Sequence, residues 1–457
     1  MLSKIEHLRR QGTEAKQMNS TRTTERLHIS WGRKNMSAAK FSRLVGVAVR
    51  GPLRLELRAV STSTTKLTEL KPNIPPPEQL FVPLSVPTKL LFGPGPSNPS
   101  MRIYNASAMS LLGHLQSDFH HVMDETKAGL KYVFQTNNKY TLAITGAGHA
   151  AMEASIMNLV ERGERILVCN NGMWGARAQE IAERQGCDVR VLEKSPGDYY
   201  TKEEIEQGLK EHKPSVLFIV HSESSSGICQ PLEGIGDLCH KHNCLIIVDT
   251  VASLGGTPFL TDGWDLDCVY TGSQKCLGAP PGISPITFSP RAMAKVNSRK
   301  TKVPSFYLDI NELGNYWGCD DGPRRYHHTA AINLVYALRE SLALLAEEGI
   351  ENSWKRHNDT IEHLWAGIEK MGLEMFVKDK ALRLPTVTSV KVPEGFPDWK
   401  AVPDYLMKKY KLEIVGGMGP TVGKVWRVGF MGHNSYKENV DLFLRLFKEA
   451  IDSVKNS

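Results

Sequence analysis

The sequence lacks a long uninterrupted hydrophobic run. None of its apolar stretches approaches the roughly 18 residues that a membrane-spanning helix needs. The composition, 41% hydrophobic and 23% charged, is typical of an ordinary globular chain. We therefore expect a soluble protein that has no membrane as a partner.

The sequence also lacks the cysteine spacing of a metal site or a disulfide framework. Its 8 cysteines are spread over 457 residues without a CxxC pair, and Cys239 and Cys244 have no second pair that would complete a zinc site. This pattern predicts reduced, mostly buried thiols and no metal site.

Basic charge is scarce outside the N-terminus. Residues 1–65 contain 13 Lys and Arg against 4 Glu, a net charge of +9, and the whole chain carries +7, so the remaining 392 residues carry −2. Because the body of the protein is not basic, we do not expect nucleic acid as a partner.

Residues 1–65 are rich in Arg, Ser and Thr and poor in acids, as organelle transit peptides are. An amphipathic helix in this segment could place Leu44, Val47 and Leu55 against Arg43 and Arg50. We predict a mitochondrial transit peptide over residues 1–65 and a protein of the mitochondrial matrix, with a disordered basic tail as the alternative. The C-terminus does not read Ser-Lys-Leu, which makes a peroxisomal pool less expected without excluding it.

Residues 66–89 form a proline-rich segment, "KLTELKPNIPPPEQLFVPLSVPTK". Proline does not continue a helix and favours extended backbone. The segment is therefore predicted to be an extended arm, which either links two parts of the chain or reaches across a partner subunit.

From about residue 90, short apolar runs alternate with helical stretches. The runs "YTLAIT", "RILVC", "VLFIV" and "LIIVD" are expected to be buried strands, and in the helical stretch "TKEEIEQGLKEH" Thr201 and Glu204 have the spacing of a capping box. This alternation predicts an α/β fold with a mainly parallel sheet between two layers of helices. In such folds ligands bind beyond the carboxyl ends of the strands.

Four features accompany Lys275 at the expected strand ends, and one of them is "HSESSSG" (221–227), which clusters hydroxyl groups after "VLFIV". Lys275 in "VYTGSQKCLGAPPG" has no acid nearby in the sequence, and Asp249 closes "LIIVD", where a buried carboxylate needs a cationic partner. The turn "TGAGH" opens a helix whose first amides can hold a phosphate, and Trp174 follows the Asn-Gly turn of "NNGMW". An amine, a carboxylate, a phosphate cradle and a flat ring together fit pyridoxal 5′-phosphate (PLP).

Two nucleotide-binding alternatives fit the sequence less well. "GAGHAA" (146–151) has the form G-x-G-x-x-A, but the next expected strand, "RILVCNNG", ends in amides where a dinucleotide site requires an acid. "GGMGPTVGKV" (416–425) lacks the spacing of a P-loop and the Ser or Thr that should follow its lysine.

Several stretches, in the same order, resemble the class V pyridoxal-phosphate aminotransferases. They are "LFGPGPSN", "GAGHAAMEA", "NGMWGARA", "HSESSSG", "VDTVASLGG", "TGSQKCLGAPPG", "YWGCDDGPRRYHHT" and "LRLPTVT". The resemblance runs from about residue 80 to the C-terminus. It implies the PLP-dependent transferase fold type I, with a large three-layer PLP-binding domain over residues 90–348, a smaller C-terminal α+β domain over residues 349–457, and a homodimer with shared sites.

The resemblance also implies roles for individual residues. Lys275 would bond the cofactor covalently and later carry a proton, and Asp249 would hold the pyridine nitrogen protonated. Tyr326 and Thr329 would reach the phosphate from the neighbouring subunit. The other implied cofactor contacts are Ala147, Gly148, His149, Trp174, Ser224, Val251 and Gln274.

The expected substrate site centres on Arg427 in "VWRVG". Its planar fork could bind a substrate carboxylate at two points, although a strand arginine that points into solvent is the simpler alternative. Gly93, Gly113 and His114 complete this expected site. Gly113 matches the branch of the family that uses alanine and glyoxylate, whereas His114 departs from the family pattern.

The implied reaction moves the amino group of L-alanine, and of L-serine, to glyoxylate, giving glycine and pyruvate or hydroxypyruvate. A 3-hydroxykynurenine or kynurenine transaminase is the main alternative, but relatives with that activity carry Ser-Asn where this chain has Gly113 and His114. A cysteine desulfurase is disfavoured because no cysteine follows Cys319. The presence of Lys275 and Asp249 disfavours a non-catalytic PLP-fold binding protein.

Overall fold

The computed structural model describes residues 73–456, so the predicted transit peptide and the first part of the predicted arm lie outside the described residues. Within 73–84, one short 3₁₀ helix, η2 (Glu78–Phe81), lies between the extended residues Pro77 and Val82, and none of its residues is buried. Residues 85–457 form a separate compact unit.

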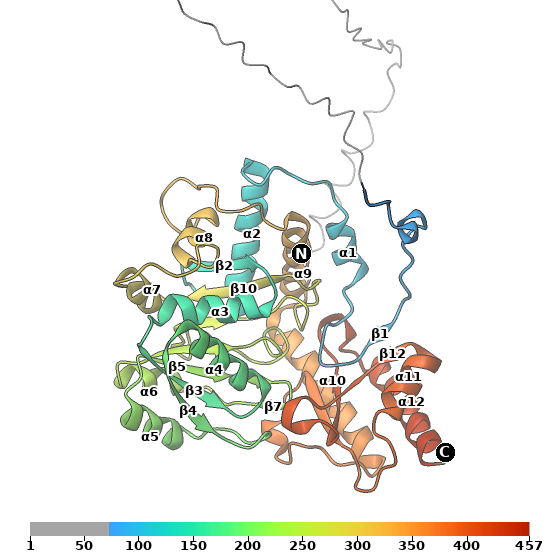
Figure 1. Ribbon diagram of the computed structural model, residues 1–457. Coiled ribbons are helices and arrows are strands. Elements are labelled where there is room, and N and C mark those ends of the chain that lie inside the picture. Colours follow the sequence, from blue (N-terminus) through green and yellow to red (C-terminus); the bar gives the residue numbers. More distant parts are fainter. Residues whose placement is uncertain (1–72, 457) are drawn as a thin grey trace, which may run out of the picture. The chain divides into compact units, whose positions relative to one another are not determined.

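A seven-stranded sheet is the centre of this unit, and helices flank it in a three-layer α/β arrangement (Figure 1). The strand order is β2-β10-β9-β8-β5-β3-β4. Only β10 runs antiparallel to its neighbours, and all the other pairs are parallel. The strands are β2 (Tyr140–Thr145), β3 (Arg165–Asn170), β4 (Asp188–Glu193), β5 (Val216–Val220), β8 (Leu245–Asp249), β9 (Cys268–Tyr270) and β10 (Ile283–Phe288).

The central strands are apolar because both of their faces are covered. Every residue of β5, β8, β9 and β10 is buried, as expected for a sheet between two helix layers. The helices of this part are α1 (Met101–Ser107), α2 (Ser117–Phe134), α3 (Gly148–Leu159), α4 (Met173–Gln185), α5 (Lys202–His212), α6 (Ile235–Lys241), α7 (Pro290–Asn297), α8 (Ile310–Tyr316) and α9 (Ile332–Glu348). The capping box predicted for α5 is confirmed, since Thr201 accepts from the Glu204 amide and Glu204 accepts from the Thr201 amide.

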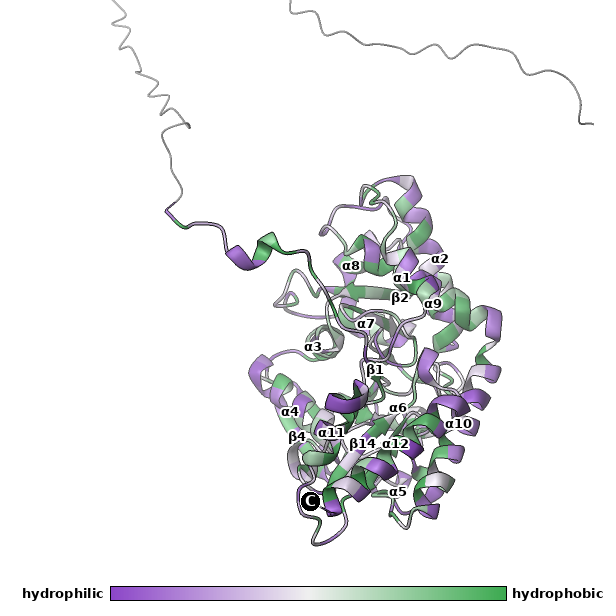
Figure 2. Cartoon of the chain, turned by 90° about the vertical axis from the view of Figure 1, so that its right-hand side faces the viewer, coloured by the Kyte–Doolittle hydropathy of each residue, from purple (hydrophilic) through white to green (hydrophobic). Residues whose placement is uncertain are grey.

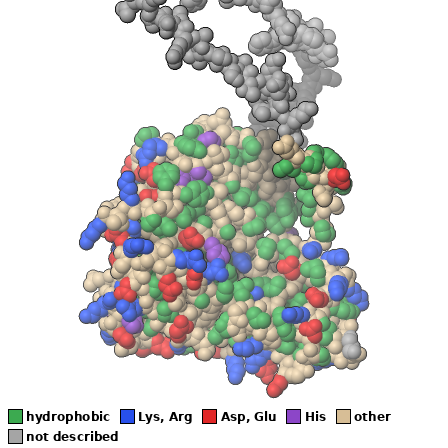
Figure 3. All heavy atoms as spheres, viewed as in Figure 1, with side chains coloured by type: hydrophobic (Ala, Val, Ile, Leu, Met, Phe, Trp, Pro, Cys, Tyr) green, Lys and Arg blue, Asp and Glu red, His purple; other side chains and the backbone are tan. Residues whose placement is uncertain are grey.

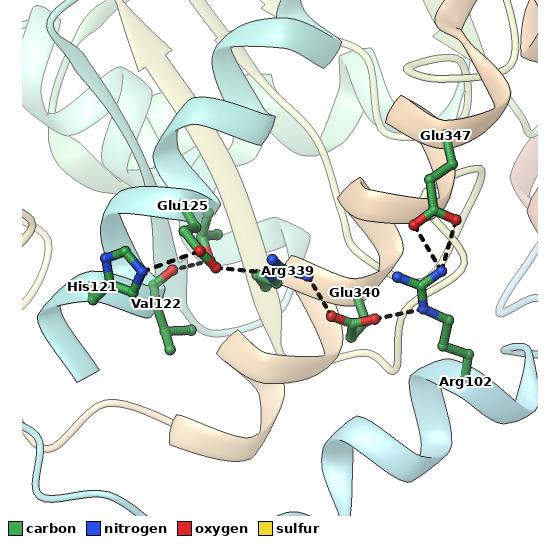
Figure 4. Close-up of polar contacts among 8 residues, drawn as sticks. Arg102, His121, Val122, Glu125, Arg339, Glu340 and Glu347 are labelled. Carbon is green, nitrogen blue, oxygen red and sulfur yellow. Dashed lines mark hydrogen bonds and ion pairs between the residues drawn. The ribbon is translucent and has the colours of Figure 1, made fainter. Parts of the chain in front are cut away.

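A chain of ion pairs joins α1 and α2 to α9 (Figure 4). Arg102 of α1 binds Glu340 at 2.7 Å and Glu347 at 2.7 Å, both on α9. Arg339 of α9 continues the chain to Glu125 of α2 at 2.8 Å. Exposed pairs of this kind contribute about 0–1 kcal/mol each, so packing rather than charge holds the helices together, and the ion pairs fix their relative orientation.

The C-terminal part has a second hydrophobic core around a three-stranded antiparallel sheet. Helices α10 and α12 each show a hydrophobic and a hydrophilic side (Figure 2). Along α12 the buried residues include Val440, Phe443, Phe447 and Ile451, which lie on one face as their spacing predicts. The elements are α10 (Ile350–Lys370), η3 (Lys380–Leu382), β11 (Val387–Lys391), α11 (Ala401–Tyr410), β12 (Leu412–Glu413), β13 (Val415–Gly416), η4 (Gly419–Thr421), β14 (Val425–Gly429), η5 (Gly432–Asn434) and α12 (Lys437–Lys455).

The segment before α1 also belongs with this second core. Strand β1 (Leu90–Leu91) pairs in parallel with β12, and Phe92 is buried among C-terminal residues, with its ring 4.9 Å from that of Phe430. The chain therefore passes the C-terminal part before it enters the large domain, which brings Gly93 and Pro94 close to β14 and to the Lys275 turn.

Across residues 73–456, none of the helices is both long and apolar enough to cross a lipid bilayer. The 8 cysteines are all free thiols, and only Cys187 and Cys229 are partly exposed.

Candidate active site

The predicted site residues of the large domain meet where the parallel strands end. The register places Asp249 of β8 beside Val220 of β5 on one side and beside Tyr270 of β9 on the other. A cavity lies at these strand ends. Its lining residues are Ala147, Gly148, His149, Met152, Trp174, Asp249, Val251, Tyr270, Gln274 and Lys275.

Lys275 lies in the turn that follows β9, and its side chain is only partly exposed. Its Nζ donates a hydrogen bond to the carbonyl oxygen of Pro94. Loss of solvation, helped by the nearby positive charge of Arg427, lowers the pKa of Lys275 to about 8. The lysine is thereby held close to the neutral, nucleophilic form at physiological pH.

Gly95 allows the chain to pass directly over this lysine. Its φ of +111° lies in the region that favours glycine, and a Cβ at this position would lie 2.5 Å from the Lys275 side chain. The "FGPGPSN" turn is therefore shaped around Lys275.

Asp249 is 2% exposed and has two hydrogen-bond donors. The amide of Val251 donates to its Oδ1 at 2.8 Å, and the hydroxyl of Tyr270 donates to its Oδ2 at 2.7 Å. Burial raises the pKa of Asp249 to about 6, although both hydrogen bonds and the charge of Lys275 favour the ionised form. A cationic ring nitrogen beside this carboxylate would compensate its charge, which is costly to bury without a partner.

The start of α3 provides an anion site next to this carboxylate. Ala147 is the N-cap residue and makes no side-chain cap, so a bound anion can satisfy the first amides of the helix. Arg177 contacts the His149 imidazole at 3.2 Å, and burial together with the charge of Arg177 lowers the pKa of His149. Gln274, one residue before Lys275, lines the same cavity.

Trp174, on the first turn of α4, supplies the flat surface of the site. Its indole Nε1 donates to Ser224 Oγ at 2.9 Å, and the His149 ring meets it edge-on with centroids 5.8 Å apart. Val251 lines the cavity as well, so an aromatic ring and a branched aliphatic side chain both face it. This combination suits a planar aromatic ligand.

Arg427, in the middle of β14, is buried and does not point into solvent. Only 5% of it is exposed, and it donates from Nε to the Gly416 carbonyl at 2.9 Å and from Nη1 to the Ser224 carbonyl at 3.2 Å. Burial lowers its pKa to about 10, although the nearby charge of Glu223 opposes the shift. Arg427 does not line the cavity itself, but its charge is close enough to act on Lys275.

The other predicted residues fall into two places. Gly93 is buried, and its carbonyl oxygen passes close to Gly429 of β14. Gly113 and His114 lie with Tyr326 on the outside of the same chain, where the rings of His114 and Tyr326 are 5.2 Å apart. Thr329 is exposed too. Among the residues described, the Lys275 cavity is lined by none of Gly113, His114, Tyr326 and Thr329.

Sequence reasoning missed two buried side chains of the site. Tyr270 binds Asp249, and the signal for it was a tyrosine that ends an apolar run, since a buried phenol needs a hydrogen-bond partner. Glu223 was hidden inside "HSESSSG", a stretch that we interpreted only as a cluster of hydroxyl groups, although a fully buried carboxylate lies at its centre.

The residues fit PLP on grounds that the structure itself provides. A lysine with a lowered pKa, a buried carboxylate without an ion-pair partner among the described residues, an uncapped helix start and an aromatic wall all border one cavity. Fold and site together define a PLP-dependent transferase of fold type I.

Comparison with known proteins narrows this class. The family model described as aminotransferase class V matches residues 98–443, and the chain belongs to that family. Members of the family are PLP-dependent, and PLP is the cofactor of this chain.

Relatives cover most of the chain. A protein of Callithrix jacchus named alanine–glyoxylate aminotransferase is 51% identical over 83% of this chain and 91% of its own length. A protein of the same name from Drosophila melanogaster is 49% identical over 84% of this chain and 97% of its own. Among solved structures, an alanine–glyoxylate aminotransferase from Nostoc sp. has a TM-score of 0.80 at 46% identity and covers 83% of this chain and 100% of that chain.

Proposed function

We propose that this protein transfers the amino group of L-alanine, and of L-serine, to glyoxylate. The observation that carries the proposal is the identity of about half of the residues to relatives named alanine–glyoxylate aminotransferase, over more than four fifths of the chain. A Bacillus subtilis relative named (S)-ureidoglycine–glyoxylate transaminase is 35% identical. Glyoxylate is thus named as a substrate for this more distant relative as well.

The chain's own residues divide the work of such a reaction. PLP, when bound, supplies an electron-accepting ring. Lys275 would provide the amine that anchors it and, once free, a base that moves the proton from the substrate α-carbon to C4′ of the cofactor. Asp249 holds a proton on the ring nitrogen, and Tyr270 and the Val251 amide keep its carboxylate in place.

The charges of the site favour small monocarboxylic substrates. Arg427 is a buried guanidinium that makes hydrogen bonds to backbone carbonyls, so its positive charge is available to a substrate carboxylate. Besides Arg427, no arginine of the described chain lines the Lys275 cavity or acts on the charge of Lys275. A second, distal carboxylate would therefore be desolvated without a partner.

A panel of donors and acceptors on purified protein that lacks residues 1–65 tests the proposal. We expect the highest kcat/KM with alanine and glyoxylate, lower but measurable rates with serine, and rates at least about tenfold lower with aspartate or glutamate, because an unpaired carboxylate costs more than one hydrogen bond. Higher rates with kynurenine or 3-hydroxykynurenine than with alanine and glyoxylate would overturn the assignment.

We also propose that the protein is a homodimer with sites completed across the interface. Support comes from exposed hydrophobic side chains. Tyr326 is 59% exposed, and Met101, Met109 and Leu111, which lie in and just after α1, are exposed as well. Hydrophobic side chains gather over α1 and α9 on the face shown in Figure 3. An isologous contact would cover such side chains on both copies and bring Tyr326 and Thr329 to the partner's phosphate site.

Mixed dimers provide the test of shared sites. Lys275→Ala and the double variant Tyr326→Phe/Thr329→Ala should each have little activity alone, whereas unfolding and refolding them together should restore roughly a quarter of the wild-type activity, because half of the dimers are mixed and each has one intact site. If the mixture stays as inactive as its components while mixed dimers are detected by native mass spectrometry, the two residues do not act in trans. Fully active monomers would contradict the dimer.

Import into the mitochondrial matrix, with a peroxisomal pool left open, rests on residues 1–65, which lie outside the described residues. It stays a prediction.

A further inference from the structure

Glu223 is an interior carboxylate that forms no ion pair among the described residues. It lies on the short strand β6 (Ser222–Glu223), which pairs with β7 (Ile228–Cys229) beyond the end of β5, and it is 0% exposed. Within residues 73–456 no Lys, Arg or His side chain comes within ion-pair distance of it. A buried acid of this kind is costly unless other groups compensate its charge.

The compensation comes from the first turn of α4. The Trp174 amide donates to Glu223 Oε2 at 2.9 Å, and the Ser225 amide and hydroxyl donate to Oε1 at 3.0 and 2.6 Å. The Ser225 hydroxyl in turn accepts the Met173 amide at 3.1 Å. Since the N-cap residue Gly172 has no side chain, Glu223 and Ser225 together cap α4 from a different part of the chain.

Gly172 allows this close approach. A Cβ at Gly172 would lie 2.5 Å from the Glu223 side chain, so any other residue would push the carboxylate away from the helix start. The partial positive charge of a helix N-terminus also favours an acid at this point.

The residues next to Glu223 contact both Trp174, which lines the cofactor cavity, and Arg427, the proposed substrate-binding residue. Ser224 accepts the Trp174 indole at its hydroxyl and the Arg427 guanidinium at its carbonyl. The Ser225 carbonyl accepts a hydrogen bond at 3.2 Å from the hydroxyl of Thr421, the last residue of η4, which precedes β14. A displacement of Glu223 would therefore move the ring-stacking tryptophan, and through Ser224 the carboxylate-binding arginine.

We propose that Glu223 is a positioning residue that fixes Trp174 and Ser224 against the cofactor ring and, through Ser224, holds Arg427 in register with them. It touches neither substrate nor cofactor. The inference rests on the assignment of the cavity to PLP and does not depend on which amino acid is the donor.

The pKa of Glu223 is raised by burial and by the neighbouring Asp249, and lowered by its three donors. The net shift is upward, so burial outweighs the donors. Without these donors the ionised carboxylate would be less stable still.

The test compares Glu223→Gln, Glu223→Ala and Ser225→Ala with wild type. Two readouts are the dissociation constant of PLP for the apoenzyme and the hydrogen–deuterium exchange of peptides that contain Met173 and Trp174. Neither readout requires turnover of alanine, so failure of the inference and failure of the proposed reaction are distinguishable. The matched control is Glu204→Gln, which weakens the capping box of α5, a helix that carries no site residue.

We expect the PLP dissociation constant to rise roughly tenfold in Glu223→Gln and further in Glu223→Ala, because a charge-assisted acceptor is weakened in the first and lost in the second. Exchange at the start of α4 should accelerate in the same order, and Ser225→Ala should show a smaller effect on both. Glu204→Gln should lower only Tm. If the Glu223 and Ser225 variants keep wild-type PLP affinity and exchange, or lower Tm as Glu204→Gln does without changing either, the proposal is wrong.

Discussion

Lys275→Ala is expected to lower kcat by at least about 10²- to 10⁴-fold, the usual contribution of a positioned acid–base group, and further because the covalent anchor for PLP is lost. In the proposed reaction this side chain is the nucleophile and the proton carrier, and no second lysine lines the cavity in the described chain. Borohydride reduction followed by mass spectrometry should find PLP attached to the peptide with Lys275 in wild type and not in the variant.

A surface lysine supplies the control for this experiment. Lys355 is 72% exposed and pairs only with Asp359 on the same helix, so Lys355→Ala should keep full activity and the cofactor attachment. Attachment of PLP to another lysine with wild-type turnover in Lys275→Ala would contradict the assignment.

The lowered pKa of Lys275 predicts how the capture of PLP by the apoenzyme depends on pH. Because burial lowers it to about 8, the neutral amine becomes the main form above pH 8, well below the usual range of a lysine. The rate at which apoenzyme captures PLP should therefore rise up to about pH 8 and then level off. A rate that keeps rising to pH 10 would mean that the amine is not desolvated in the apoenzyme.

The strand ends were predictable from sequence because buried parallel strands leave a clear pattern. Each of the four expected apolar runs became a strand. Asp249 ends β8, and Trp174 and Lys275 follow the ends of β3 and β9. The rule that ligands bind there then places all three at one cavity. The capping box of α5 was predictable for the same reason, since its signal is local.

Register and strand direction were not predictable from local patterns. The hydrogen bond between Tyr270 and Asp249 depends on how β9 pairs with β8, which no spacing in the sequence expresses. β10 is fully buried like β5 and β8, but it runs antiparallel to both of its neighbours, β2 and β9. Phe92 joined the C-terminal core because β1 pairs with a strand more than 300 residues away.

The burial of Arg427 could not be decided from sequence either. An arginine flanked by apolar residues suits an exposed strand face as well as an interior site, and only the packing of β14 against the "HSESSSG" segment distinguishes them. The proposed action of Tyr326 from a partner subunit is a further limit, since in the described residues Tyr326 does not line the Lys275 cavity.

Arg427→Ala is expected to weaken every amino acid and 2-oxo acid tested while PLP stays bound. Removing one partner of a buried, hydrogen-bonded charge pair costs about 2–5 kcal/mol, which corresponds to a roughly 30- to 5,000-fold loss in kcat/KM. The loss should appear mainly in KM, because in the proposed role the guanidinium binds the substrate carboxylate equally before and during the reaction. PLP absorbance without substrate should be unchanged.

Arg427→Lys separates charge from geometry. Lysine keeps a positive charge but replaces the planar fork with a single ammonium, so it cannot hold a carboxylate at two points while also reaching the Gly416 and Ser224 carbonyls. We expect it to recover only part of the affinity. Arg383→Lys is the matched control, since Arg383 binds the Val377 carbonyl and the Trp365 ring, away from the cavity.

The comparison of substrates decides what the arginine does. If Arg427 binds the carboxylate that all the substrates share, alanine, serine and glyoxylate should lose affinity by similar factors, and propylamine, which has no carboxylate, should bind wild type and variant equally. If instead Arg427→Ala lowers kcat without a change in KM, or loses PLP while Arg383→Lys does not, the guanidinium supports the cofactor site through Ser224 and does not bind substrate.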